Sequence, residues 1–86
     1  MTEIQKQYLS ELVESYAEIL YEDRQRPIDD RMLPTPGLDF RRGILLGYCG
    51  TFDLCMNFYN NEITIKNNKN VIIFSINLDQ FKEEDD

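Results

Sequence analysis

The chain has 86 residues, of which 42% are hydrophobic, and it contains no histidine. This length suffices for one domain and excludes two, because a chain of this size buries only about 60–65% of the surface that it exposes when unfolded. The formal net charge of −7 disfavours direct binding to nucleic acid or to an anionic membrane, and it favours a basic partner.

The first predicted element is a helix over residues 3–23 with Thr2 as its N-cap, because apolar residues recur there with the helical period. The apolar arc consists of Ile4, Tyr8, Leu9, Leu12, Val13, Tyr16, Ala17, Ile19 and Leu20. The opposite arc holds Gln7 and four glutamates, Glu11, Glu14, Glu18 and Glu22, which we call the acidic stripe. No lysine stands at the helical spacings that would neutralise this stripe.

Residues 24–39 are expected to form a long connector with one short turn at 28–32. The residues that break both helices and strands in it are Pro27, Pro34, Pro36 and Gly37. A connector of this length is uncommon in so small a domain and tends to be functional. The domain itself is expected to span residues 1–81, followed by an acidic tail at 82–86.

All five arginines of the chain lie between Arg24 and Arg42. In one interpretation they fold back onto the acids of the first helix, while Asp29 and Asp30 cap or bridge locally. In the other, the five arginines present bidentate donors to a carboxylate or phosphate of a partner, and Arg24, Arg26 and Arg31 are the candidate contacts among them.

Residues 40–60 allow two interpretations. As a helix after an Asp39 cap, they place ten apolar side chains inward: Phe40, Ile44, Leu45, Tyr48, Cys49, Phe52, Cys55, Met56, Phe58 and Tyr59. Gly43, Gly47 and Gly50 then share one line, where we expect two helices to approach closely. As a hairpin that turns at Gly50-Thr51, the same residues segregate onto neither face. The pattern favours the Gly-containing helix and keeps the hairpin as the alternative.

The C-terminal third predicts an antiparallel β-hairpin with strands at 62–66 and 71–77 around a loop at 67–70. The expected register pairs Lys66 with Val71, Ile65 with Ile72, and Ile63 with Phe74, so that five apolar side chains, including Ile76, share one face. The whole is therefore an α+β fold. A two-stranded sheet exposes both edges, which favours helix cover or strand pairing in a homodimer.

Recognisable catalytic chemistry is missing from the sequence. Without histidine there is no Ser-His or Cys-His pair, and most zinc sites are excluded. Cys49 and Cys55 are too far apart in sequence for a zinc knuckle, and we expect reduced thiols in a cytoplasmic protein, since no secretion signal or membrane span is evident. The glycines match no phosphate-binding loop. We therefore expect no enzyme, no cofactor and no metal.

Two hypotheses for function remain. The first is a binding protein that occupies a basic, nucleic-acid-binding surface of another protein. Its candidate contact residues are Glu11, Glu14, Glu18, Glu22, Tyr21, Arg24, Arg26, Asp29, Asp30 and Arg31, with Tyr21 as an exposed aromatic contact. In size, charge and asparagine content the chain resembles the small inhibitors of phages and other mobile elements, including anti-CRISPR proteins and DNA mimics. The second hypothesis is a regulatory or structural homodimer, such as an accessory subunit.

Overall fold

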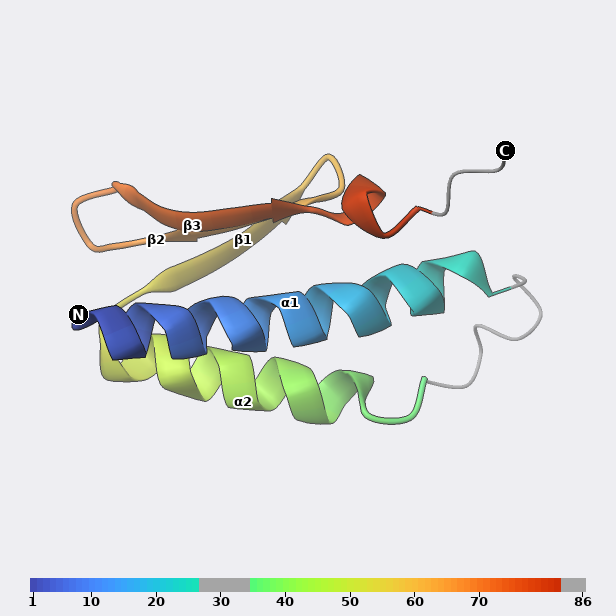
Figure 1. Cartoon of the computed structure of the whole chain (residues 1–86), viewed down its shortest axis with the longest axis horizontal. Helices are drawn as coiled ribbons and strands as arrows, with labels where there is room; N and C mark the ends of the chain where they lie inside the picture. The colour runs from blue at the N-terminus through green and yellow to red at the C-terminus, as the bar shows by residue number, and fades with distance from the viewer. Residues whose placement is uncertain (27–34, 83–86) are drawn as a thin grey trace.

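The computed structural model of the chain describes residues 1–26 and 35–82. In chain order its elements are α1 (Glu3–Gln25), α2 (Leu38–Thr51), β1 (Cys55–Tyr59), β2 (Glu62–Lys66), β3 (Ile72–Asn77) and the short 3-10 helix η2 (Leu78–Phe81). The strands form one antiparallel sheet in the order β1-β2-β3. The α+β fold with a long N-terminal helix and a C-terminal hairpin is confirmed, with one strand more than expected (Figure 1).

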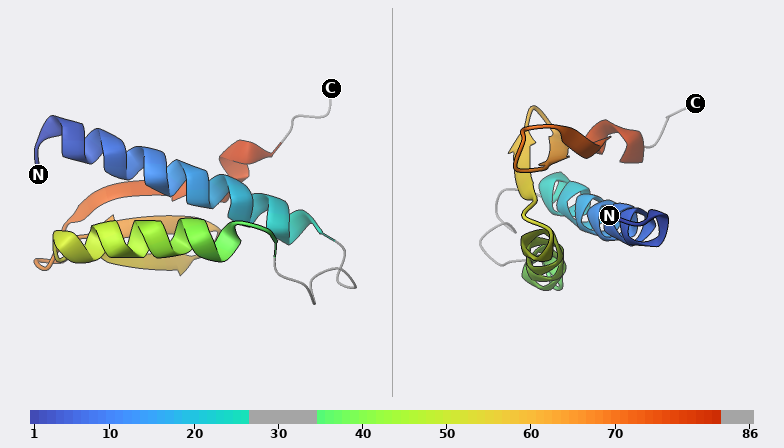
Figure 2. Two further views of the ribbon diagram at one scale, coloured as in Figure 1. Left: turned by 90° about the horizontal axis from the view of Figure 1, so that it is seen from below. Right: turned by 90° about the vertical axis from the view of Figure 1, so that its left-hand side faces the viewer.

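The two helices lie on one side of the sheet (Figures 1 and 2). Helix α1 packs against α2 along its length and also contacts β3 and η2, whereas α2 contacts β1. The β3 side of the sheet is therefore supported by α1 and the β1 side by α2. The described helices leave the other face of the sheet uncovered.

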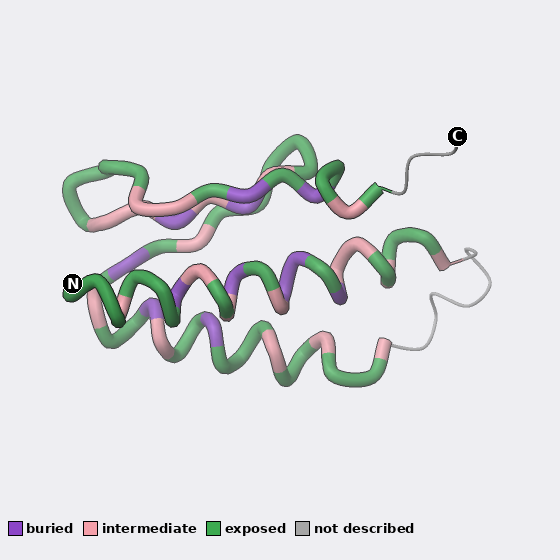
Figure 3. The backbone as a smooth tube through the Cα atoms, in the orientation of Figure 1, coloured by how far each residue is buried: buried purple, intermediate pink, exposed green. Residues whose placement is uncertain are grey.

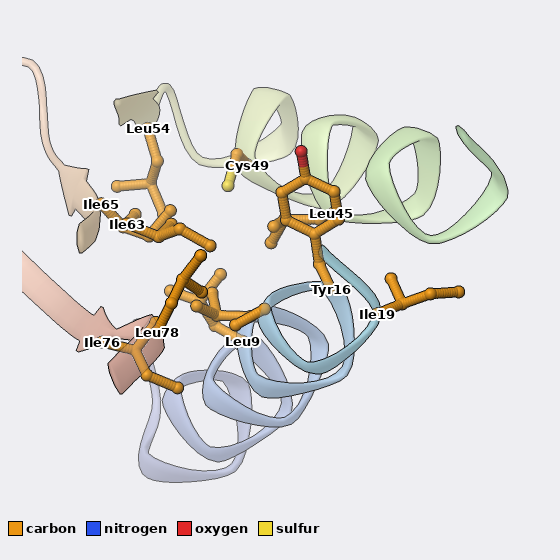
Figure 4. Packing of buried hydrophobic residues seen from close by; sticks show 12 residues of the cluster. Leu9, Tyr16, Ile19, Leu45, Cys49, Leu54, Ile63, Ile65, Ile76 and Leu78 are labelled. Atoms are coloured by element: carbon orange, nitrogen blue, oxygen red, sulfur yellow. The ribbon is translucent and has the colours of Figure 1, made fainter. Parts of the chain in front are cut away.

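The core lies between α1, α2 and the inner face of the sheet (Figures 3 and 4). It contains Leu9, Val13, Tyr16, Ala17, Ile19, Leu45, Cys49, Leu54, Ile63, Ile65, Ile76 and Leu78. Ile63 and Ile65 of the central strand are fully buried. The residues that the structure describes bury no charged side chain, so burial of apolar surface is the main stabilising contribution.

Helix α1 begins where the sequence predicted and ends two residues later, at Gln25. The Thr2 hydroxyl accepts from the Gln5 backbone N–H at 3.1 Å, and the Thr2 N–H donates to Gln5 Oε1 at 2.8 Å, which is a reciprocal capping box. From Leu9 onward the apolar arc is buried or half-buried, whereas at its start Ile4 is 80% exposed. Tyr8 is also exposed, and its ring packs edge-on against Tyr48.

The helical interpretation of residues 40–60 is correct only as far as Thr51. There the Leu54 N–H donates to the Cys49 carbonyl at 2.9 Å, and the Asp53 N–H donates to the Gly50 carbonyl at 3.4 Å. These two bonds, with Asp53 in a left-handed conformation (φ 55°), form a Schellman motif that ends the helix and buries Leu54. The chain then enters β1, so the expected inward helical face of Cys55, Met56, Phe58 and Tyr59 is wrong.

The start of α2 also differs from the expectation. Its N-cap is Gly37, with φ of 85°, and Asp39 lies in the first turn. A left-handed φ favours glycine, and a Cβ at Gly37 would lie 3.5 Å from Ile19 Cδ1. Leu45 and Cys49 face the core as expected, but Phe40 and Ile44, also expected inside, are exposed because they lie at the edge of the predicted apolar arc.

The glycines of α2 do not mediate a helix–helix approach, contrary to the expectation. Gly43, Gly47 and Gly50 are exposed, and a Cβ at any of them would have no described atom within 4 Å. They lie on the side of α2 opposite the buried Leu45 and Cys49. The helices pack through larger side chains, and the glycine face of α2, defined by these three residues, is uncovered in the part of the chain that the structure describes.

The predicted C-terminal hairpin is present, but its register is shifted. Ile65 pairs with Phe74 and Ile63 pairs with Ile76, two residues from the expected partners. Asn67 closes the loop: its N–H donates to the Val71 carbonyl, and its side chain accepts from the N–H groups of Lys69 and Val71. An irregularity at Ile65/Lys66 then places Ile72 opposite Lys66, where it is 58% exposed.

Candidate functional site

The acidic stripe lies on an exposed face of α1. All four side chains, Glu11, Glu14, Glu18 and Glu22, are exposed, and they lie away from the face that buries Leu9 and Val13. Their spacing of three, four and four residues corresponds to about 16 Å along the helix axis, or one carboxylate per about 5.5 Å. Each strand of double-stranded DNA carries one negative charge per about 3.4 Å along the helix axis. The stripe is therefore a regular but sparser row of negative charge.

The stripe is not neutralised within residues 1–26 and 35–82. None of its four glutamates takes part in an ion pair there, and the ion pair nearby joins Arg26 to Asp23 at 3.7 Å. Arg41 reaches α1, but its Nη1 donates to the Ser15 carbonyl at 3.0 Å. Arg26 and Arg41 therefore both contact α1, but neither forms an ion pair with a glutamate of the stripe.

Arg24 and Arg26 contact groups outside the stripe. The Arg24 guanidinium lies 4.6 Å from the centre of the Phe58 ring, and its Nη1 donates to Asn61 Oδ1 at 3.1 Å. Arg26 donates to the Thr35 hydroxyl at 2.9 Å, and that hydroxyl donates to Asp23. Through these contacts both arginines link the C-terminal end of α1 to other segments of the chain, Arg24 to the β1–β2 hairpin and Arg26 to Thr35. The other candidates from the connector, Asp29, Asp30 and Arg31, lie outside the described residues, as does the turn expected at 28–32.

Tyr21 is half-buried rather than the exposed contact that we expected. Its ring lies 6.2 Å from that of Phe81, because η2 folds back onto the C-terminal half of α1. Two aromatic side chains that the sequence did not indicate as exposed contacts are exposed in the structure. They are Tyr59 in β1, which is 77% exposed, and Phe40 in α2, which is 71% exposed. The signal for Tyr59 is the Asn60-Asn61 pair that follows it, since two consecutive residues with positive φ form the tight turn of a hairpin.

A hollow of about 750 Å³ lies between the end of α1 and η2. Its charged lining combines two acids, Asp23 and Asp79, with two bases, Arg24 and Lys82. Residues 1–26 and 35–82 hold no group of three potential metal-ligating side chains, in this hollow or elsewhere. The mixed charges do not select a ligand of one sign.

The two cysteines are free thiols in different surroundings. Cys49 is buried and Cys55 is exposed. Burial raises the pKa of the Cys49 thiol, and the nearby Cys55 raises it further. Burial likewise raises the pKa of Tyr16, although Arg42 and Arg24 oppose that shift. A raised thiol pKa disfavours the thiolate, so Cys49 is suited to core packing rather than to nucleophilic chemistry.

These two shifts predict a loss of stability in alkali. Both groups hold their protons more tightly in the folded chain, so their contribution is fully present below the ordinary thiol pKa of 9.0 and is lost as the pH rises through the folded-state values. Urea midpoints should stay level up to about pH 8 and then fall. Replacement of both groups, Cys49→Ala with Tyr16→Phe, should flatten that fall, whereas Cys55→Ser should reduce it only in part, because Cys55 is the smaller of the two causes of the Cys49 shift. An equally steep fall in the double variant would contradict this assignment.

No helix within 1–26 and 35–82 combines the length and the apolar character that a membrane crossing requires. The described surface offers two separate features, the acidic stripe on α1 and the strand edge at β1, on the side of the sheet that α2 contacts. Compared with known proteins, the chain matches no family model, no curated protein and no solved structure.

Proposed function

We propose that the chain is a non-catalytic protein-binding module whose acidic stripe docks on a basic surface of another protein. The observation that supports this proposal is the row of four exposed glutamates on one rigid helix, none of which pairs with a described cation. Because the 23-residue helix already orders the backbone of the row, binding costs side-chain entropy but little further backbone entropy. The favoured target is a surface evolved for nucleic acid, because such surfaces carry lysine and arginine in rows.

The mode of action in this proposal is occupation. A protein that covers a nucleic-acid-binding surface blocks it without chemistry, which is how small phage or mobile-element inhibitors can act. The stripe supplies attraction and orientation, and its electrostatic field speeds the encounter with an oppositely charged surface. The two free thiols are consistent with a reducing compartment, and we place the protein in the cytoplasm as part of the proposal.

Charge reversal of the stripe tests the proposal. The double variant Glu14→Lys/Glu18→Lys should reduce capture of the partner from native cell extract by about tenfold or more, because it places like charges against each other. The captured protein is identified by mass spectrometry at low and high salt. Because both positions are exposed, the circular dichroism melt should remain close to that of the unmodified chain.

The matched control is Glu62→Lys/Asp79→Lys, which changes the net charge equally but lies off the stripe, in β2 and η2. It should retain capture. High salt should weaken capture by the unmodified chain, since screening acts on exposed charges. Equal capture by the two double variants, or capture that salt does not weaken, would overturn the proposal.

A further inference from the structure

Strand β1 forms an open edge of the sheet. Its one strand neighbour is β2. Tyr59 and Glu62 flank the two-residue Asn60-Asn61 turn and therefore form a hydrogen-bonded pair. Such pairs alternate along an antiparallel ladder, so Asn57 and Cys55 also direct their backbone groups to β2. The N–H and C=O groups of Met56 and Phe58 consequently point away from the sheet.

No backbone hydrogen bond joins Met56 or Phe58 to another element of the described chain. Two donors and two acceptors on alternate residues are complementary to a second copy of the same edge in antiparallel orientation. In that arrangement Met56 exchanges both hydrogen bonds with Phe58 of the copy, and the two-fold axis passes between the two Asn57 residues. This register uses all five residues of β1.

The inner-face side chains of β1 fit this pairing. On the inner face, Met56 would lie opposite Phe58 of the copy, and both are incompletely covered in the single chain. A thioether against an aromatic ring is a favourable cross-strand contact. The strand carries no charged residue and no proline, the usual devices that keep strand edges apart. The chain as a whole has a net charge of −7, but the β1 edge itself is uncharged. Charges on β1 therefore do not repel a second copy that approaches this edge.

The opposite edge of the sheet is less suitable. Strand β3 contains the irregularity opposite Ile65/Lys66, which interrupts a straight edge. Helix α2 contacts β1 whereas α1 contacts β3. Both helices lie on one side of the sheet (Figure 2), so a sheet extended past β1 would carry the two copies of α2 on the same face.

We propose that the protein self-associates through β1, forming a two-fold dimer with a continuous six-stranded sheet centred on Asn57. The occupant of the edge is a second copy, because the unpaired groups of β1 match their own two-fold image. This proposal is independent of the acidic stripe, which lies on α1, and it is tested with the purified chain alone.

Engineered cysteines test the register. In a Cys55→Ser background, Asn57→Cys should form a covalent dimer under mild oxidation, because opposed residues of a non-hydrogen-bonded pair have Cα atoms about 4.5 Å apart, within the range of a disulfide. Ser75→Cys in the same background is the matched control, since Ser75 is exposed on the other edge strand. It should remain monomeric under denaturing, non-reducing electrophoresis.

Sedimentation velocity tests the association itself. The unmodified chain should shift with concentration from 10.2 kDa to twice that mass. Asn57→Lys should weaken the dimer about fivefold or more by opposing two like charges, whereas Ser75→Lys should not. A constant mass of 10.2 kDa, a covalent dimer through Ser75→Cys, or equal effects of the two lysine variants would overturn the proposal.

Discussion

Replacement of Ile65 by alanine should lower the free energy of unfolding by about 2–5 kcal/mol. Ile65 is fully buried at the centre of the core, in the one strand that pairs on both sides (Figure 4). Removal of three methyl or methylene carbons leaves a cavity that the paired strands on both sides hinder from closing. A domain of this size has about 4–13 kcal/mol of stability in total, so the variant should lie close to the unfolding threshold.

Urea denaturation followed by circular dichroism measures this loss. Ile65→Val should cost about 0.5–1.5 kcal/mol, which gives a graded series at one site. Thr64→Ala is the neighbouring control, because Thr64 points to the outer face of the same strand and should cost less than about 1 kcal/mol. Equal losses at Ile65 and Thr64 would contradict the inward orientation of Ile65.

Substitution of alanine for Gly43 and Gly47 together should raise the free energy of unfolding by about 1–2 kcal/mol. Both glycines lie within α2, both lack the positive φ that would require glycine, and an added Cβ would meet nothing within 4 Å among residues 1–26 and 35–82. Alanine restricts the unfolded chain more than glycine does, and here it brings no clash. Urea denaturation at low protein concentration measures the gain without a contribution from self-association.

Gly37→Ala is the opposite-sign control for this prediction. Gly37 has φ of 85°, a conformation that alanine rarely adopts, and a Cβ added there would lie 3.5 Å from Ile19 Cδ1. Alanine at this position should therefore destabilise the fold. A loss of stability in the Gly43→Ala/Gly47→Ala variant would show that the glycine face is covered.

Much of α1 could be predicted from the sequence, and the reason is that helical periodicity is local. The Thr2 cap and the separation of Leu9 and Val13 from the acidic stripe depend on residues at most a few turns apart. Exposure of Glu14 and Glu18 follows from the same pattern, since the broad apolar arc can face only one way. This part of the candidate site therefore needed no tertiary information.

The helical interpretation of residues 40–60 was wrong beyond Thr51 because two local signals overlapped. The apolar spacing continues past Thr51 as though the helix did, and the stop comes from Asp53, whose left-handed conformation closes the Schellman motif where glycine is the usual residue. Burial of Leu54 in the core favours that turn. The Asn60-Asn61 pair is compatible with the type I′ turn of a hairpin. Such a turn can be recognised from the sequence only when a strand is already predicted before it.

The sequence by itself determined the long first helix, its acidic stripe, the α+β class and the C-terminal hairpin, because each of these depends on side-chain periodicity within one segment. Tertiary structure decided where α2 ends, the shifted register of β3, the half-burial of Tyr21 and the uncovered glycine face. Those features depend on which surfaces meet when segments distant in sequence pack together. Local pattern limits such choices, and the packing of the whole core selects among them.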